Sequence, residues 1–439
     1  MKPYNLFGVI LVVLGFMGPH PVAAQTPDSL DRYLETAAKN NPGLNADFLA
    51  YKASLEKVPQ AGAWPDPQLD IGFFLKPMDI VGGRQIADFT LMQMFPWFGT
   101  KKAAQTEATH MARMAYARFT ETRDNLFLEV YTQWYLLSTL VQQLRNNREN
   151  LQLLKQLEEL ALRKVSSSSS GMSSGMGNTA PGMSDVLRVQ LEMAEIENNI
   201  ESILSEIAAE KAKFNALLNR SADREVILPD SIAKVPFFFD EGVTMSEIEN
   251  RNPMLDMLVE EEQAYRAKGE MDQKMSYPMF GIGLQYMLIG ESATAQMEQG
   301  MEPEMTGMDM IMPMVSISIP LYRNKYKAQQ RESRFLWQSA REKYNNTLNM
   351  LQSDLFRLKH QLDDAERKIA LYRKQEQLAR TTYQLVVQEF ISAKSDLTNV
   401  IQVQRQLLDY QLREAEAIAE YNTRVASIRK LRSFNTSNN

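Results

Sequence analysis

Methionine offers the most distinctive chemistry in this chain: 26 of the 439 residues are methionines, whereas cysteine is absent and only three residues are histidine. Two groups stand in polar, glycine-containing segments, the first formed by Met172, Met176 and Met183, the second by Met297, Met301, Met305, Met308, Met310, Met312 and Met314. Thioether sulfur is a soft ligand that suits Cu(I) and, by the same logic, Ag(I). We therefore expect transient soft-metal contacts in both groups, with composition as the alternative explanation, because methionine is also a tolerant filler.

Other reactive side chains are scarce. The absence of cysteine excludes disulfides, thiolate zinc sites and a cysteine nucleophile. His110 and His360 each stand without a metal-ligand partner one helical turn away, and the acidic run Glu260–Glu262 is typical of a solvated helix face. We predict no catalytic residues, no enzyme activity and no cofactor. The net charge of -6 argues against a nucleic-acid partner.

The elements that must position the methionines are mostly long helices. Residues 100–170 and 321–439 contain neither glycine nor proline, and apolar residues such as Leu140, Leu144 and Leu151 recur at helical spacing. A helix rises about 1.5 Å per residue, so the first stretch could span about 100 Å. The pattern predicts antiparallel coiled-coil helices. Taken alone, it would also fit an exported structural coiled-coil protein.

Four short segments alternate between apolar and other residues and predict two pairs of strands. The first pair comprises 68–74 and 86–95, within a strand region over 68–95. The second comprises 279–288 and 315–319, within a region over 279–319, with the second methionine group in the intervening loop. The aromatic residues near the strand ends are typical of a membrane interface: Phe95, Trp97, Phe98, Tyr277, Tyr286 and Tyr322.

The N-terminal residues predict export. Lys2 precedes an apolar run and then a small-residue site ending at Ala24, which is the order of a secretory signal peptide over residues 1–24. No later segment approaches the length of about 18 apolar residues that a spanning helix needs. We therefore expect a Gram-negative periplasmic or outer-membrane protein.

The chain also predicts an internal repeat. Asn41-Pro42 and Asn252-Pro253 each begin a helix that leads to a strand pair, and Pro96 and Pro320 each close a pair before a long helix. The first repeat covers 25–240, with a Met/Ser-rich tip insert at 166–184, and the second covers 241–439. Four strands per chain are too few for a barrel, and open sheet edges are not viable in lipid. Strands that enter a membrane would therefore be shared by several chains, and three chains would supply twelve.

The residues in this order resemble the TolC-type outer-membrane factors over about residues 28–432. The resemblance is carried by the two Asn-Pro pairs, by Trp64-Pro65-Asp66-Pro67, by residues 93–99 (QMFPWFG) and by the segment 390–405. It implies a mainly α fold with a small β part, a homotrimeric α/β barrel set in outer-membrane lipid and extending into the periplasm. It also implies a periplasmic adaptor protein and an inner-membrane pump of the RND type as partners.

The resemblance also implies a periplasmic gate at the helical tip. The two aspartates that narrow the entrance in TolC itself correspond to Asn399 and Gln402 here, whereas Asp396 lies one turn earlier and Asp185 takes the equivalent place in the first repeat. Copper and silver efflux ducts form one branch of the family, which agrees with the methionine groups. A duct of the same build that serves drug efflux or type I protein secretion is the alternative function.

Overall fold

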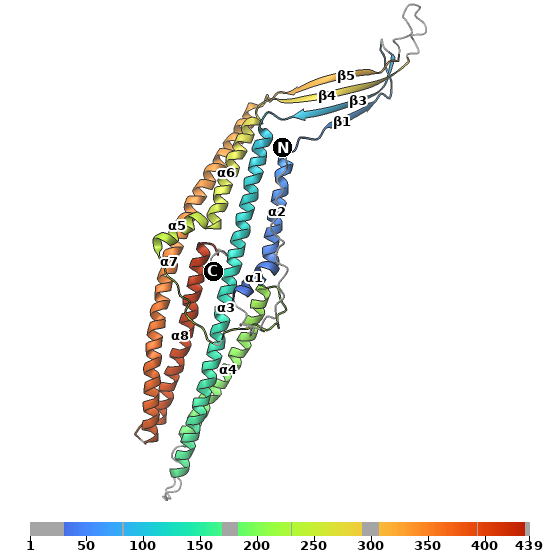
Figure 1. The fold of residues 1–439 in the computed structure, drawn as a ribbon. Helices are drawn as coiled ribbons and strands as arrows, with labels where there is room; N and C mark the ends of the chain where they lie inside the picture. The colour runs from blue at the N-terminus through green and yellow to red at the C-terminus, as the bar shows by residue number, and fades with distance from the viewer. Residues whose placement is uncertain are drawn as a thin grey trace, which may run out of the picture.

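The computed structural model describes residues 30–80, 83–168, 183–229, 231–291, 307–392 and 394–434. These residues form an elongated molecule in which a small sheet projects from one end of a set of long helices (Figure 1). The first half contains α1 (Leu30–Asn40), α2 (Pro42–Gly62), β1 (Gln68–Phe73), β2 (Asp79–Ile80), β3 (Gly83–Phe95), α3 (Thr100–Ser168) and α4 (Met183–Leu217). The second half contains α5 (Glu241–Arg251), α6 (Pro253–Lys274), β4 (Met279–Gly290), β5 (Met310–Ser318), α7 (Arg323–Ile391) and α8 (Leu397–Leu431).

The two halves repeat the same elements at nearly the same lengths. Both α3 and α7 have 69 residues, and both α4 and α8 have 35. At about 1.5 Å per residue, each of the two longest helices is about 100 Å long. The predicted mainly α fold with a small β part and two internal repeats is therefore confirmed. The predicted signal peptide over 1–24 lies outside the described residues.

The two Asn-Pro pairs perform the same structural task in each half. Asn41 accepts a hydrogen bond from the Leu44 amide at 3.1 Å and donates one to the Leu217 carbonyl, at the end of α4, at 3.0 Å. Asn252 accepts one from the Met254 amide at 3.0 Å and donates one to the carbonyl of Leu431, at the end of α8, at 2.9 Å. Each asparagine thus caps one helix at its start and satisfies a carbonyl at the end of another.

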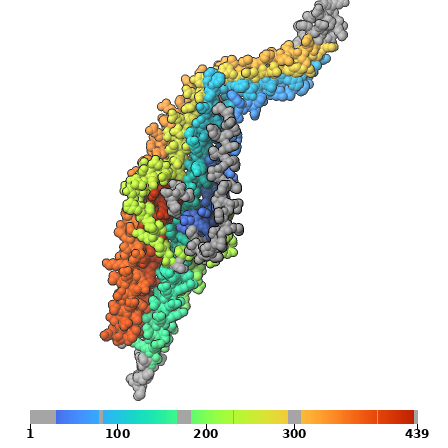
Figure 2. All heavy atoms as spheres, in the orientation of Figure 1, coloured from blue at the N-terminus to red at the C-terminus, as the bar shows by residue number. Residues whose placement is uncertain are grey.

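The apolar stripes of the long helices face one another. In the described structure α3 packs along α2, α4, α6 and α8, and α7 packs along α6 and α8. Towards the helical tips, a continuous core includes the buried side chains of Leu154, Val189, Phe390 and Val400. Leu140, Leu144 and Leu151 belong to or pack against the same core, so their helical spacing predicts the packing of α3 correctly. Figure 2 shows the narrow body that results.

The acidic run at 260–262 is an exception, because it does not face solvent as predicted. Glu260 lies 2.6 Å from Nδ1 of His110. Glu261 accepts a hydrogen bond from Lys343 at 3.0 Å, and Glu262 accepts one from the Trp337 indole at 2.9 Å. The three carboxylates therefore connect α6 to α3 and α7, which sequence spacing does not reveal because their partners are distant in the chain.

The sheet is antiparallel in the order β1-β3-β4-β5, with the two-residue β2 beside β3. The central β3–β4 pair joins the two halves and runs from Arg84–Gly290 to Phe95–Phe280. Strand β5 begins at Met310 and not at Val315 as predicted, because Met310–Met314 pair with Met287–Gly283 of β4. Pro313 argues for a break in the sequence, but a terminal strand of the sheet tolerates proline.

Candidate functional site

The two faces of the sheet differ in chemistry. One face is aliphatic and aromatic: residues that the strand pairing places side by side on it include Leu69, Ile71, Phe73, Phe89, Leu91, Phe95, Phe280, Ile282, Leu284, Tyr286, Ile311, Val315 and Ile317. Many of these side chains are exposed, and the exposed fraction is 63% for Ile282 and 79% for Val315. No helix of the described chain packs on the strands themselves. This face therefore presents a large apolar surface to the surroundings.

The opposite face carries polar residues, glycine and methionine. Residues paired on it include Asp70, Asp88, Thr90, Met92, Met94, Gly281, Gly283, Gln285, Met287, Met310, Met312, Met314 and Ser316. Since neighbouring positions in a strand point to opposite faces, these residues alternate with those of the apolar face along each long strand. The same alternation marks strands that have lipid on one side and water on the other.

The methionines of this face lie around two glycines. A side chain added at Gly281 would come within 2.6 Å of the Met94 sulfur and 3.2 Å of the Met92 sulfur. Both sulfurs therefore lie near one point above β4, and Met314 pairs directly with Gly283 on the far side. The glycines leave the space that the thioethers occupy. At the distal end of the face, Met287 pairs with Met310, and the Gln85 amide lies 3.3 Å from the Met287 sulfur.

This arrangement corrects the predicted position of part of the second methionine group. Met310, Met312 and Met314 belong to β5 and not to a loop, and Met308 stands two residues before the strand. Met297, Met301 and Met305 lie outside the described residues. Met92, Met94 and Met287 are not among the predicted methionines. The alternation of Met92 and Met94 within a strand is a signal that could have identified these two.

At the opposite end of the molecule lie the predicted gate residues. Asp396, Asn399 and Gln402 are exposed and follow one another at three-residue spacing at the start of α8. Asp185 lies in the first turn of α4. Of the first methionine group, Met183 is the exposed first residue of α4, whereas Met172 and Met176 lie outside the described residues.

Polar contacts hold the starts of α4 and α8 together. Arg188 of α4 donates a hydrogen bond to Thr398 of α8. Arg405 of α8 donates a 2.7 Å hydrogen bond to Glu192, which raises the pKa of the guanidinium. Asp185 and Asp396 therefore lie at the same end of two helices that are in contact. Each half of the chain therefore places one aspartate at this end, and the gate at the tip stays a prediction.

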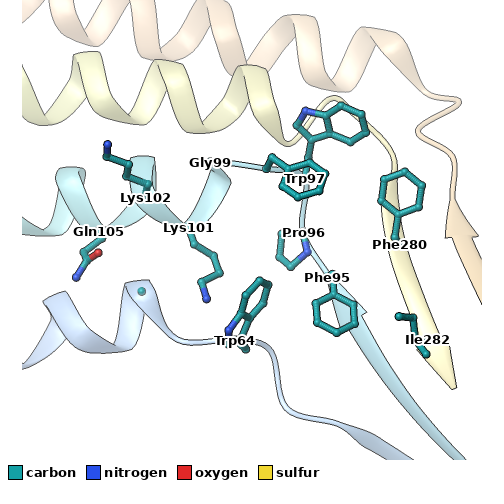
Figure 3. Close-up of a pocket in the computed structure, with 12 residues that line it drawn as sticks. Trp64, Phe95, Pro96, Trp97, Gly99, Lys101, Lys102, Gln105, Phe280 and Ile282 are labelled. Carbon is teal, nitrogen blue, oxygen red and sulfur yellow. The ribbon is translucent and has the colours of Figure 1, made fainter. Parts of the chain in front are cut away.

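A crevice opens where the strands meet the helices (Figure 3). Its volume is about 820 Å³. It is lined by Gly62, Trp64, Phe95, Pro96, Trp97, Phe98, Gly99, Lys101, Lys102, Gln105, Phe280 and Ile282. Trp97 stacks on Tyr277 with ring centroids 5.1 Å apart, and Trp64 meets Phe95 edge to face at 5.3 Å. Of the aromatic residues predicted near strand ends, four therefore lie at this junction: Phe95, Trp97, Phe98 and Tyr277. Tyr286 lies within β4 beside Phe89, and Tyr322 is exposed.

The described residues include no cluster of three or more His, Cys, Asp or Glu side chains that could hold a metal ion. The soft ligands that the described strands bring together are the methionine sulfurs near Gly281. In the described part of the chain, no helix combines the length and the apolar composition needed to cross a membrane.

Comparison with known proteins gives matches to solved structures only. No family model matches the sequence, and no curated protein matches it. The outer membrane protein VceC from Vibrio cholerae is 15% identical and has a TM-score of 0.72, over 93% of this chain and 96% of that chain. CusC, whose structures concern folding and transmembrane channel formation, is 12% identical with a TM-score of 0.74, over 93% of both chains.

The Campylobacter jejuni CmeC outer membrane channel is 13% identical and has a TM-score of 0.65, over 94% of this chain and 88% of that chain. Identities this low establish similarity of fold and carry no direct information on cargo. The matches span nearly the whole length of both proteins, helices and strands together. The chain therefore has the fold of TolC-type outer-membrane channels.

Proposed function

We propose that this chain is one subunit of a homotrimeric exit duct in the outer membrane of a Gram-negative cell. The observation that carries the proposal is the sheet, which has one exposed apolar face and one polar face and projects from helices about 100 Å long. Four strands leave two open edges, which lipid does not tolerate, whereas three chains supply the twelve strands of a closed barrel. The helices would then continue the duct through the periplasm.

The fold similarity to outer-membrane channels supports this proposal. The duct would be passive and would perform no catalysis, because it only conducts a substrate that other proteins deliver. A periplasmic adaptor protein and an inner-membrane pump of the RND type would dock at the helical tip, near Asp185 and Asp396. Energy would come from the pump.

We further propose that the cargo is Cu(I) or Ag(I). In a barrel whose apolar face meets lipid, the opposite face lines the channel and carries Met92, Met94, Met312 and Met314. Soft thioethers distributed along the channel wall could exchange a soft ion from one sulfur to the next. Contacts of this kind must be weak, because a conducting site has to release what it binds.

The first experiment is growth of a deletion strain on copper, silver, zinc, cobalt and several drugs, with and without the restored gene. The proposal expects sensitivity to copper and silver alone. Sensitivity to drugs with unchanged copper tolerance would contradict the metal cargo and favour a drug duct. Normal growth together with a protein that does not fractionate with the outer membrane would contradict the duct itself.

A second experiment removes sulfur without removing volume, since methionine and leucine exchange with little loss of stability. We expect the combined change of Met92, Met94, Met312 and Met314 to leucine to lower copper tolerance while trimers still form. The control exchanges Met254 and Met257 of α6 for leucine and should leave tolerance unchanged. If the two variants tolerate copper equally well, the methionines of the sheet do not contribute to copper export, and the sheet no longer supports a metal cargo.

The helical tip is tested separately. Changing Met172, Met176 and Met183 together to serine should sensitise cells to copper without preventing trimer assembly, if these residues receive the ion from the adaptor or the pump. Unchanged tolerance would restrict the metal contacts to the sheet.

A further inference from the structure

The crevice at the base of the sheet combines an apolar wall with a basic rim. Phe95, Phe280 and Ile282 line it and belong to the apolar face of β3 and β4, so the wall continues that face without interruption. At about 820 Å³, the crevice lies in the size range of pockets that hold small organic ligands. Its apolar wall suits the first segment of an acyl chain.

The basic rim comes from the first turn of α3. The Lys101 ammonium lies 3.3 Å from the centroid of the Trp64 ring, and Lys102 follows it on the same turn. Figure 3 shows Lys101 extending toward Trp64 beside Phe95, whereas the Lys102 ammonium points away from Lys101. None of the described residues that line the crevice is acidic, so nothing in the lining neutralises the two ammonium groups. Lysine and tryptophan side chains of this kind are apolar along their length and polar at one end, which suits the boundary between lipid and water.

We propose that this crevice binds one anionic phospholipid, with its headgroup phosphate at Lys101 and an acyl chain along Phe95, Phe280 and Ile282, while Lys102 adds positive charge to the rim without contacting the same phosphate. The inference rests on the proposed function, which places the sheet in the membrane and the helices in the periplasm. The crevice then lies at the inner leaflet, level with the headgroups. Positive charge at a membrane surface favours anionic lipid by about fivefold in affinity per lysine.

Trp64 serves as a reporter, because an acyl chain in the crevice would lie near its ring. The full-length protein is placed in phosphatidylcholine nanodiscs that contain a small fraction of brominated phosphatidylglycerol, and the quenching of tryptophan fluorescence is measured. The same measurement on Trp64→Phe isolates the signal of this residue. Brominated phosphatidylcholine at the same fraction gives the quenching that follows from membrane contact without charge selection.

We expect the relative affinity for phosphatidylglycerol to be about 25-fold higher than for phosphatidylcholine, because each of the two lysines contributes about fivefold. Lys102→Gln should lower that ratio about fivefold. It is the primary variant, because Lys101 touches the reporter ring and its removal would alter the fluorescence directly. The matched control is Lys57→Gln, an exposed lysine of α2 outside the crevice, which should leave the ratio unchanged. Circular dichroism and trimer migration verify that each variant folds.

Equal quenching by the two lipids, or an unchanged ratio in Lys102→Gln, would overturn the lipid site. A tryptophan introduced by Leu284→Trp, midway along the apolar face, reports membrane insertion independently. If that residue is quenched and Trp64 is not, protein covers the crevice, and the lipid site is wrong while the duct stands. If neither residue is quenched, the sheet does not lie in lipid, and the proposed function fails together with the lipid site.

Discussion

The sheet and the helical body use apolar residues in opposite ways. In the helices, apolar side chains at three- and four-residue spacing are hidden between neighbours, and Leu355 of α7 is 2% exposed. In the sheet, Leu284 of β4 is 49% exposed, and the apolar face has no helix of the described chain packed on it. The difference indicates that the helices acquire their core within the chain, whereas the sheet requires an apolar environment from outside.

The strongest way to break this comparison is to place a charge on the apolar face of the sheet. We expect Leu284→Arg to destabilise the membrane-inserted barrel by about 2–4 kcal/mol for each chain, because an arginine near the middle of a lipid-facing strand is poorly solvated. A trimer would carry this loss three times. Trimer assembly and outer-membrane fractionation are measured. Gln285→Arg, at the next position on the opposite face, is the control and should assemble normally. Equal defects in the two variants would mean that the faces do not differ in solvent.

A cavity in the helical core tests whether the helices bury their apolar residues within the chain. Leu355→Ala removes a buried side chain from the core between α7 and α8 and should lower the free energy of unfolding by about 2–5 kcal/mol. Leu385→Ala on the same helix removes a side chain that is 60% exposed, and we expect a change of about 0.5 kcal/mol or less. Thermal or denaturant unfolding measures both. A similar loss at the two positions would show that partner chains bury the outer face of α7 as deeply as its core.

A smaller effect is expected within the helical body, where each Asn-Pro pair joins the start of one helix to the end of another. Asn252→Ala removes a helix cap and leaves the Leu431 carbonyl without its donor, so we expect a loss of about 1–2 kcal/mol in the free energy of unfolding. The control is Asn250→Ala, an exposed residue of α5 whose hydrogen bond stays within its own helix. If the control is equally destabilising, the contact between α6 and α8 through Asn252 contributes nothing specific.

Sequence patterns predict the helices well because their cores form between stripes that recur at helical spacing. The stretch around Leu140 contains no glycine or proline, and this fixes α3 to within a few residues. The stretch around Leu378 fixes only the start of α7, because it continues without glycine or proline into α8. Strand β5 begins five residues before its predicted start, because methionine is not a strong strand former and Pro313 argues for a break. Only the pairing with β4 reveals that Met310 and Met314 belong to the sheet.

The candidate site is predictable in chemistry but not in position. The composition of the chain identifies soft sulfur ligands, whereas the register between β3 and β4 decides which sulfurs converge. Met92 and Met94 lie over Gly281 because strands from the two halves pair, which requires residues almost 190 positions apart to be neighbours. Likewise, the partners of Glu260 and Glu262 lie on distant helices and leave no local signal.

The central claim is that one face of the sheet meets lipid and the other lines an aqueous channel. Because the chain contains no cysteine, single cysteines introduced by Leu284→Cys, Gln285→Cys and Tyr286→Cys can be labelled without background. A charged, water-soluble maleimide is applied to outer membranes that carry each variant, and the rates of labelling are compared. The account predicts rapid labelling at 285 and protection at 284 and 286. Equal labelling at all three positions, or protection at 285 alone, would contradict it.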